Sequence, residues 1–125
     1  MTLQAAAKRW IKYWRSKHTL EEGFVDVEGN ERIDDLVRED ADRGLEVIRL
    51  ILDGIDPEPE SALFQVLAAG PVEDLLVHHG AAVIDRVEQL ARDDSRFNLL
   101  LGGVWPSSIA PEVWSRVEKA RREVW

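Results

Sequence analysis

The sequence contains no cysteine, which excludes disulfide bonds, thiolate catalysis and thiolate metal sites. It has no apolar run approaching the roughly 18 residues that cross a membrane. Lys8, Arg9 and Lys12 interrupt the apolar residues near the start, where a secretory signal would need them. The motifs G-x-S-x-G, H-E-x-x-H and the P-loop are also missing. These absences predict a cytoplasmic protein with no membrane segment.

Charge is the most uneven property of the chain. The net charge is −8, but residues 1–18 carry five bases and no acid, whereas residues 19–60 carry 15 acids and four bases. Such asymmetry indicates that the basic start packs against the acidic section or that one of them meets a partner. The acidic balance argues against nucleic-acid binding, which needs a basic face.

The length of 125 residues and a hydrophobic content of 45% predict one domain with its own core. We divide residues 1–125 into an N-terminal amphipathic helix (1–18), an acidic connecting segment (19–40) and a helical core (41–125). The spacing of Leu3, Ala7, Trp10 and Trp14 places one apolar stripe on the first helix. The stripe is typical of a helix that covers the core, although a basic helix bearing tryptophan also suits an anionic membrane.

Helical periodicity continues through the rest of the chain. Residues 18–29 are interpreted as an acidic, partly ordered loop, after which Asn30 is a candidate cap for a short helix ending near Val37. Further helices are predicted at 41–53, 81–93, 95–101 and from Pro111 onward. A short helix is expected to run through Val77 and to stop at His78-His79-Gly80.

Gly70-Pro71 is predicted to be a tight corner between two helices. Glycine suits the left-handed position after a helix end, and proline suits the first turn of the next helix. Glu73 and Asp74 then fall in that first turn, where the helix dipole favours acids. This corner is expected to hold the two helices at a steep angle.

Two segments of the chain are similar to each other. Phe64-x-x-Leu67-x-x-Gly70 and Phe97-x-x-Leu100-x-x-Gly103 are offset by 33 residues, which is within the range of helical-hairpin repeats. The predicted fold is therefore all-α, a compact multi-helix array with two similar helical hairpins, like HEAT repeats or an α-solenoid. A right-angled stack is favoured over an up-down bundle.

A series of short motifs follows the glycine–proline pair. They are GPVEDLL at 70–76, His79-Gly80, IDRVE at 84–88, Ala91-Arg92-Asp93, Arg96-Phe97 and Gly103-Val104-Trp105. Together they resemble a family of small bacterial proteins known as a domain of unknown function, DUF6869. The resemblance covers residues 41–117 and, more loosely, Tyr13-Trp14-Arg15-Ser16, and it leaves out residues 18–35 and the C-terminal tail. It implies no activity, cofactor or catalytic residue.

The best candidates for chemistry are Glu73, Asp74, His78 and His79. Asp74 and His78 are four residues apart on one helical face, which suits half of a metal site or an acid–base pair. Histidines in a last helical turn also interact favourably with exposed carbonyl groups and the helix dipole, without any chemistry. Because the remaining histidine, His18, lies in another region, no metal, cofactor or catalytic set is assigned.

Three tryptophans lie near the end of the chain. Trp105 is expected to plug the end of the stack, and Trp125 to dock on the N-terminal helix. Trp114 lies beside the apolar stripe of the last helix. An alternative is that Trp114 and Trp125 seal a homo-oligomer.

The leading functional hypothesis is a non-enzymatic protein-binding module that presents an acidic helical surface to a basic protein partner. An immunity or antitoxin protein is its specific form, because complementary charge speeds association and gives specificity. The alternatives are a small metal-dependent or acid–base enzyme using Asp74, His78 and His79, and a homo-oligomeric structural protein. The candidate partner surface comprises Glu31, Asp34, Asp35, Glu39, Asp40, Asp42 and Glu46.

Overall fold

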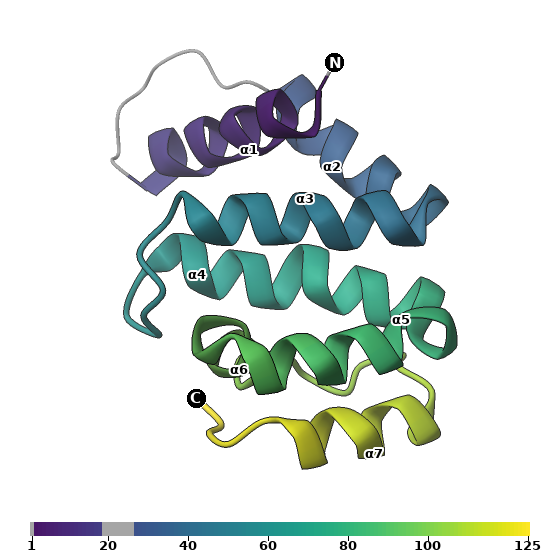
Figure 1. Ribbon diagram of the computed structural model, residues 1–125. Coiled ribbons are helices and arrows are strands. Elements are labelled where there is room, and N and C mark those ends of the chain that lie inside the picture. Colours follow the sequence, from purple (N-terminus) through teal and green to yellow (C-terminus); the bar gives the residue numbers. More distant parts are fainter. Residues whose placement is uncertain (1, 19–26) are drawn as a thin grey trace.

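The computed structural model describes residues 2–18 and 27–125, and in these ranges it is helical with no strand. Figure 1 shows the helices stacked in layers from α1 to α7, which confirms the predicted all-α class. Residues 19–26 of the predicted loop at 18–29 lie outside the described residues, but the prediction is wrong for residues 27–29, which form the start of α2. The elements are α1 (Leu3–His18), α2 (Val27–Glu39), α3 (Ala41–Asp53), α4 (Ala62–Leu67), the π-helical turn η1 (Ala68–Val72), α5 (Glu73–Asp93), α6 (Ser95–Leu101) and α7 (Pro111–Ala120).

The first helix covers one end of the core, as its apolar stripe predicts. Ala7 and Trp10 are buried against α2 and α3, whereas Trp14 is only partly buried and Tyr13 takes a buried position. The second helix differs from its prediction, because Asn30 lies inside α2 and does not cap it. In the described part of the chain, no helix is both long enough and apolar enough to span a membrane.

The predicted corner at Gly70-Pro71 is wrong. The chain runs from α4 through η1 into α5 as a nearly continuous helix, and Gly70 does not have a positive φ. Proline inside an α-helix lacks an N–H donor and collides with the carbonyl group four residues earlier. The wider π-helical turn accommodates Pro71 without ending the helix.

The chain turns instead at His79. This residue has φ −134° and ψ 18°, so α5 is sharply bent where the His78-His79-Gly80 stop was predicted. Figure 1 shows the two parts of α5 running in different directions on either side of this bend. A Cβ atom at Gly80 would lie 2.9 Å from Cγ2 of Val113, so glycine allows α7 to pack closely there. The predicted helix at 81–93 is confirmed as the second part of α5.

Figure 1 shows α3, the α4–η1 helix and α7 extending in similar directions, so the stack is not right-angled. Phe64, Leu67, Phe97 and Leu100 of the two similar segments are all buried in the common core. The segments end differently, because one continues through η1 and the other stops at Gly102-Gly103. The solenoid-like relation between them remains a prediction.

Candidate functional site

The predicted partner surface lies where α2 meets α3. Asp40, the single residue between these helices, caps α3 by accepting a hydrogen bond from the backbone N–H of Arg43 at 3.1 Å. Asp34 is partly buried, and the side chain of Glu31 lies outside the described part. The exposed members are Asp35, Glu39, Asp42 and Glu46.

Arginines pair with two carboxylates of this surface and offset part of its negative charge. Asp42 forms an ion pair with Arg86 of α5 at 2.6 Å, and Glu46 forms one with Arg49 at 3.4 Å. The segment 19–60 is strongly acidic in sequence, but part of that charge is neutralised by an arginine that lies 44 positions further along the chain.

Of the four candidate chemical residues, the structure brings Asp74 and His79 together at Arg38. Asp74 lies 3.9 Å from the Arg38 guanidinium, and Nε2 of His79 is 2.8 Å from the Arg38 carbonyl oxygen. His78 is exposed, and Glu73 interacts with a different segment. Among the residues that the structure describes, no group of three or more histidine, aspartate or glutamate side chains is arranged to hold a metal ion.

Glu73 fixes the loop that follows α6. Its carboxylate accepts hydrogen bonds from the Trp105 backbone N–H at 3.3 Å and the Ser107 hydroxyl at 3.1 Å. Burial raises the pKa of Glu73 despite these two hydrogen bonds, and the nearby charge of Asp74 raises it further. The indole of Trp105 is 66% exposed, so the expectation that it plugs the stack is wrong.

Trp125 docks on α4 and α6 and not on the N-terminal helix as predicted. Its ring stacks on Phe64 with centroids 5.4 Å apart, and its Nε1–H donates to the Leu99 carbonyl group at 2.7 Å. The Arg121 guanidinium lies 4.8 Å above the ring of Trp114. Both rings therefore have partners within the chain.

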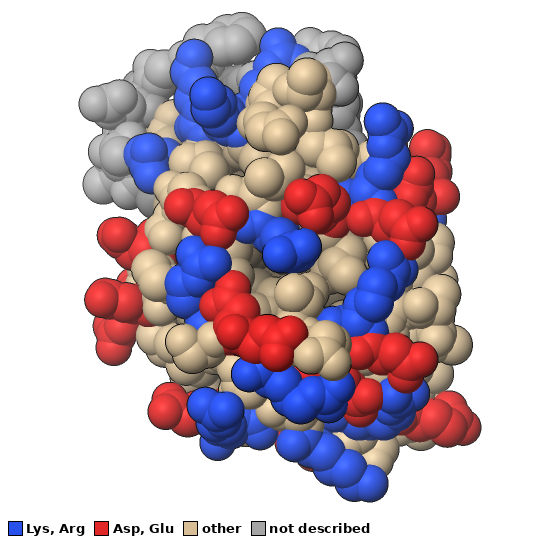
Figure 2. Space-filling view, in the orientation of Figure 1, with Lys and Arg blue, Asp and Glu red and all other residues tan. Residues whose placement is uncertain are grey.

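A groove lies between α3 and the second part of α5. Its volume is about 250 Å³. Figure 2 shows positive and negative side chains alternating over this part of the molecule, with a hollow between them. The groove is lined by Asp42, Leu45, Glu46, Arg49, Arg86, Gln89 and Leu90.

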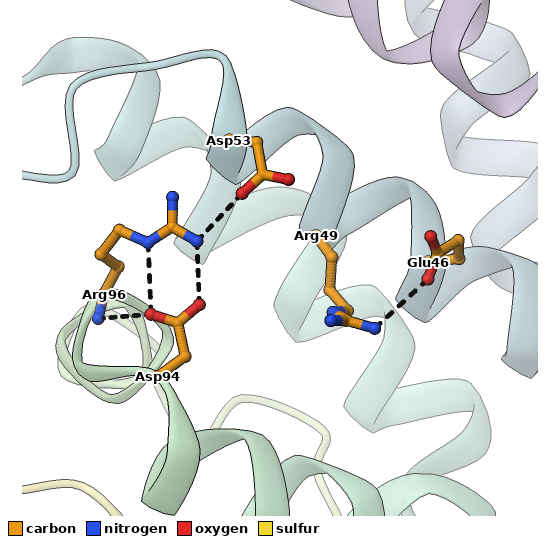
Figure 3. Close-up of polar contacts among 5 residues, drawn as sticks. All are labelled: Glu46, Arg49, Asp53, Asp94 and Arg96. Atoms are coloured by element: carbon orange, nitrogen blue, oxygen red, sulfur yellow. Dashed lines mark hydrogen bonds and ion pairs between the residues drawn. The ribbon is translucent and has the colours of Figure 1, made fainter.

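Two sets of ion pairs join α3 to later parts of the chain. Asp42 and Arg86 pair within the lining of the groove, and Arg96, outside that lining, binds Asp53 at 2.9 Å and Asp94 through two hydrogen bonds of 3.2 and 3.0 Å. Figure 3 shows the Arg96 guanidinium between the two aspartates and the Glu46–Arg49 pair further along α3. A smaller cavity of about 70 Å³ beside Arg96 shares Glu46, Arg49 and Leu90 with the groove.

The Arg96 cluster predicts a specific pH dependence. Hydrogen bonding to Arg96 lowers the pKa of Asp94 below its ordinary value of 3.8. Because the pKa is lower in the folded state, this stabilisation is present above pH 3.8 and is lost as the pH falls through the folded pKa.

The Asp94→Asn variant keeps a cap for α6 but loses the carboxylate, so its stability should fall less steeply on acidification. Urea unfolding followed by circular dichroism from pH 6 to about pH 3 measures this difference. Arg96→Gln should flatten the curve similarly, and an unchanged slope in both variants would contradict the assignment.

Sequence spacing did not identify these long-range pairs. Glu88 and Arg92 have the i,i+4 spacing of an ordinary helical ion pair, but Glu88 accepts a hydrogen bond from Nε of Arg116 on α7 at 3.0 Å. Arg92 donates instead to Gln89 at 3.0 Å. Local spacing identifies only partners on the same helix.

Comparison with known proteins finds no match among curated proteins and none among solved structures. A family of unknown function, DUF6869, matches residues 25–124. The match includes part of the segment 18–35 and the tail that the sequence resemblance left out, and it excludes the Tyr13–Ser16 stretch. Since it covers most of the chain, including α2 to α7, the protein belongs to the DUF6869 family.

Proposed function

We propose that this protein is a non-enzymatic binding module that presents the α2–α3 acidic surface to a basic protein partner. The observation that carries the proposal is the position of four exposed carboxylates. Asp35 and Glu39 are one turn apart on α2, and Asp42 and Glu46 are one turn apart on α3. Spacing of i,i+4 places each pair on one face of its helix.

The two helices are held closely enough to present these carboxylates as a preformed surface. Gly44 is buried, and a Cβ atom there would lie 3.1 Å from Cα of Val37. Val37 and Ile48 are fully buried in the core beneath the surface. A preformed acidic surface costs little ordering on association, and its field attracts a basic partner.

The specific form of the proposal is an immunity or antitoxin protein that covers a basic toxin surface. A protein that blocks a toxin by covering its basic surface needs a complementary acidic surface. It needs no catalytic group of its own. The net charge of −8 supports attraction to a basic protein at long range.

The test begins with purification of the tagged protein from its host and sequencing of the neighbouring genes. A basic partner encoded nearby should co-purify, and binding should weaken as salt increases. The double variant Asp35→Lys/Glu39→Lys should reduce the association rate about tenfold at low salt. The matched control is Glu112→Lys/Glu118→Lys on α7, which makes the same charge change at exposed positions.

The control should change the association rate less than about twofold, since it lies outside the proposed interface. Equal effects of the two double variants would contradict the α2–α3 surface. A protein that purifies alone and has no toxin-like neighbour would exclude the immunity or antitoxin form.

A further inference from the structure

A second groove, the basic groove, lies between the ends of α5 and α7 and the start of α6. Its volume of about 440 Å³ is within the range of small-molecule sites. Figure 2 shows Lys and Arg side chains gathered at the lower end of the molecule, where Figure 1 places α7. The basic groove is lined by Glu88, Ala91, Arg92, Asn98, Lys119, Ala120, Arg121 and Arg122.

The charge of this lining is opposite to that of the whole chain. Four cationic side chains and one carboxylate give an excess of +3, although the net charge of the protein is −8. The carboxylate is Glu88, and both of its oxygens already accept hydrogen bonds from Arg116. Since α5 and α7 both end here, their dipoles contribute negative charge, but only about −0.5 each. A positive excess therefore remains in the basic groove.

Three of the four cations have no carboxylate partner. Arg92, Lys119 and Arg122 form no ion pair in the part of the chain that the structure describes, and Arg92 donates only to a neutral amide. The fourth, Arg121, donates to two backbone carbonyl groups. Arginines elsewhere do bind carboxylates, namely Arg38, Arg49, Arg86, Arg96 and Arg116. The sign of the charge thus favours an anion in the basic groove.

A buried amide holds the segments that carry these cations. Asn98 donates to the carbonyl groups of Ala91 and Ala120 and accepts from the backbone N–H of Arg122. The backbone on both walls is therefore fixed before a ligand arrives, which lowers the ordering cost of binding. Like charges held on a fixed frame repel one another, and a bound anion relieves that repulsion.

The number of cations favours a phosphate group over a carboxylate. A phosphate monoester carries a charge of about −1.5 to −2 at pH 7 and has three acceptor oxygens, so it can reach cations on both walls. The planar guanidinium group also matches phosphate geometry. A long polyanion would meet the exposed carboxylates of Glu118 and Glu123, which are adjacent in sequence to Lys119 and Arg122. A compact ligand avoids this repulsion.

We propose that the basic groove binds the phosphate monoester group of a small molecule. Arg92 supplies positive charge from the α5 wall, and Lys119 and Arg122 supply it from the α7 side. The inference does not rest on the proposed protein-binding function, because the basic groove shares no residue with the α2–α3 acidic surface.

The experiment follows the amide chemical shifts of the ¹⁵N-labelled protein with three probes. Methyl phosphate is a compact monoester, succinate is a dianion whose charges lie on separate groups, and N-acetyl-phosphoserine methylamide represents a phosphorylated protein. Methyl phosphate should shift amides within residues 88–98 and 117–122 at low salt. Succinate should bind about fivefold more weakly, because it offers only one carboxylate to the cations at a time.

The variants locate the contact. Lys119→Gln/Arg122→Gln removes two exposed charges and should weaken methyl phosphate binding about tenfold, since each exposed charge contact contributes about fivefold or less. Arg92→Gln, from the opposite wall, should weaken it about threefold. Lys12→Gln/Arg43→Gln is the matched control, because it removes the same two residue types at exposed positions of α1 and α3. The control should leave the affinity unchanged within about twofold.

Each remaining outcome would overturn part of the proposal. Succinate binding as tightly as methyl phosphate would exclude phosphate as the preferred group. Absence of methyl phosphate binding, shifts outside the basic groove, or equal effects of the two double variants would reject the site. Capped phosphoserine binding about tenfold more tightly than methyl phosphate would exclude the small-molecule source and indicate a phosphorylated protein.

Discussion

Gly103→Ala is expected to lower the free energy of unfolding by about 2–3 kcal/mol, as an overpacked core position does. A Cβ atom at Gly103 would lie 2.5 Å from Cζ2 and 2.8 Å from Cζ3 of Trp125, which is closer than atoms can pack. The indole would have to leave its position, and the stacking on Phe64 and the hydrogen bond to the Leu99 carbonyl group would be lost. Urea unfolding followed by far-ultraviolet circular dichroism measures the change.

Gly70→Ala is the matched control for this variant. Nothing lies within 4 Å of a Cβ atom at Gly70, and the backbone there does not have a positive φ. Alanine should therefore leave stability unchanged or increase it by about 0.5–1 kcal/mol, because it restricts the unfolded chain. The predicted left-handed corner would require the opposite result, so a strong loss at Gly70 would contradict the helical path through η1. Equal stability of the Gly103→Ala variant and the original protein would contradict the docking of Trp125.

Asn98→Leu is the second variant with a large expected effect. It should lower the free energy of unfolding by about 2–4 kcal/mol, because buried polar groups would be left without hydrogen-bond partners. The Asn98 side chain is 5% exposed. Its Nδ2 donates to the carbonyl groups of Ala91 and Ala120, both at 3.0 Å, and its Oδ1 accepts from the Arg122 N–H at 3.0 Å. One amide thus joins the end of α5 to the end of α7 and to the segment that carries Trp125.

The control for Asn98→Leu is Gln89→Met, which also replaces an amide by an apolar side chain of similar shape. Gln89 is exposed, and its hydrogen bonds to Asp93 and Arg92 can be replaced by water. Gln89→Met should therefore lower the free energy of unfolding by less than about 0.5 kcal/mol, as most surface substitutions do. Similar losses in the two variants, measured by the same urea unfolding, would show that Asn98 does not join the two helix ends.

The exposed loop at Trp105 illustrates a limit of interpretation from sequence. A tryptophan after two glycines was expected to be buried, because tryptophan usually contributes a large apolar area to the core. The ring that packs beside these glycines is the partly buried Trp125, 22 positions after Gly103. The sequence gives no reason to place one of Trp105 and Trp125 beside these glycines in preference to the other. Only the tertiary packing decides between them.

Only part of the candidate site could be predicted from the sequence. Exposure of Asp35, Glu39, Asp42 and Glu46 follows from their places on the polar faces of amphipathic helices. The groove beside them is lined by Arg86, and Arg86 and Arg96 both reach α3 from elements far along the chain. Because pairing at that separation is set by tertiary packing, no local spacing indicates it.

The sequence by itself determined the helical class, the helices at 41–53 and 81–93, the break at His78-His79-Gly80 and the family, because apolar periodicity and ordered motifs are local properties of the chain. Tertiary structure alone decided the path through Gly70-Pro71. Local energies favour a helix end at a glycine followed by a proline, because inside a helix glycine costs about 1 kcal/mol and proline about 3 kcal/mol. The burial of Leu67, Ala68 and Val72 on either side of this pair favours the continuous helix.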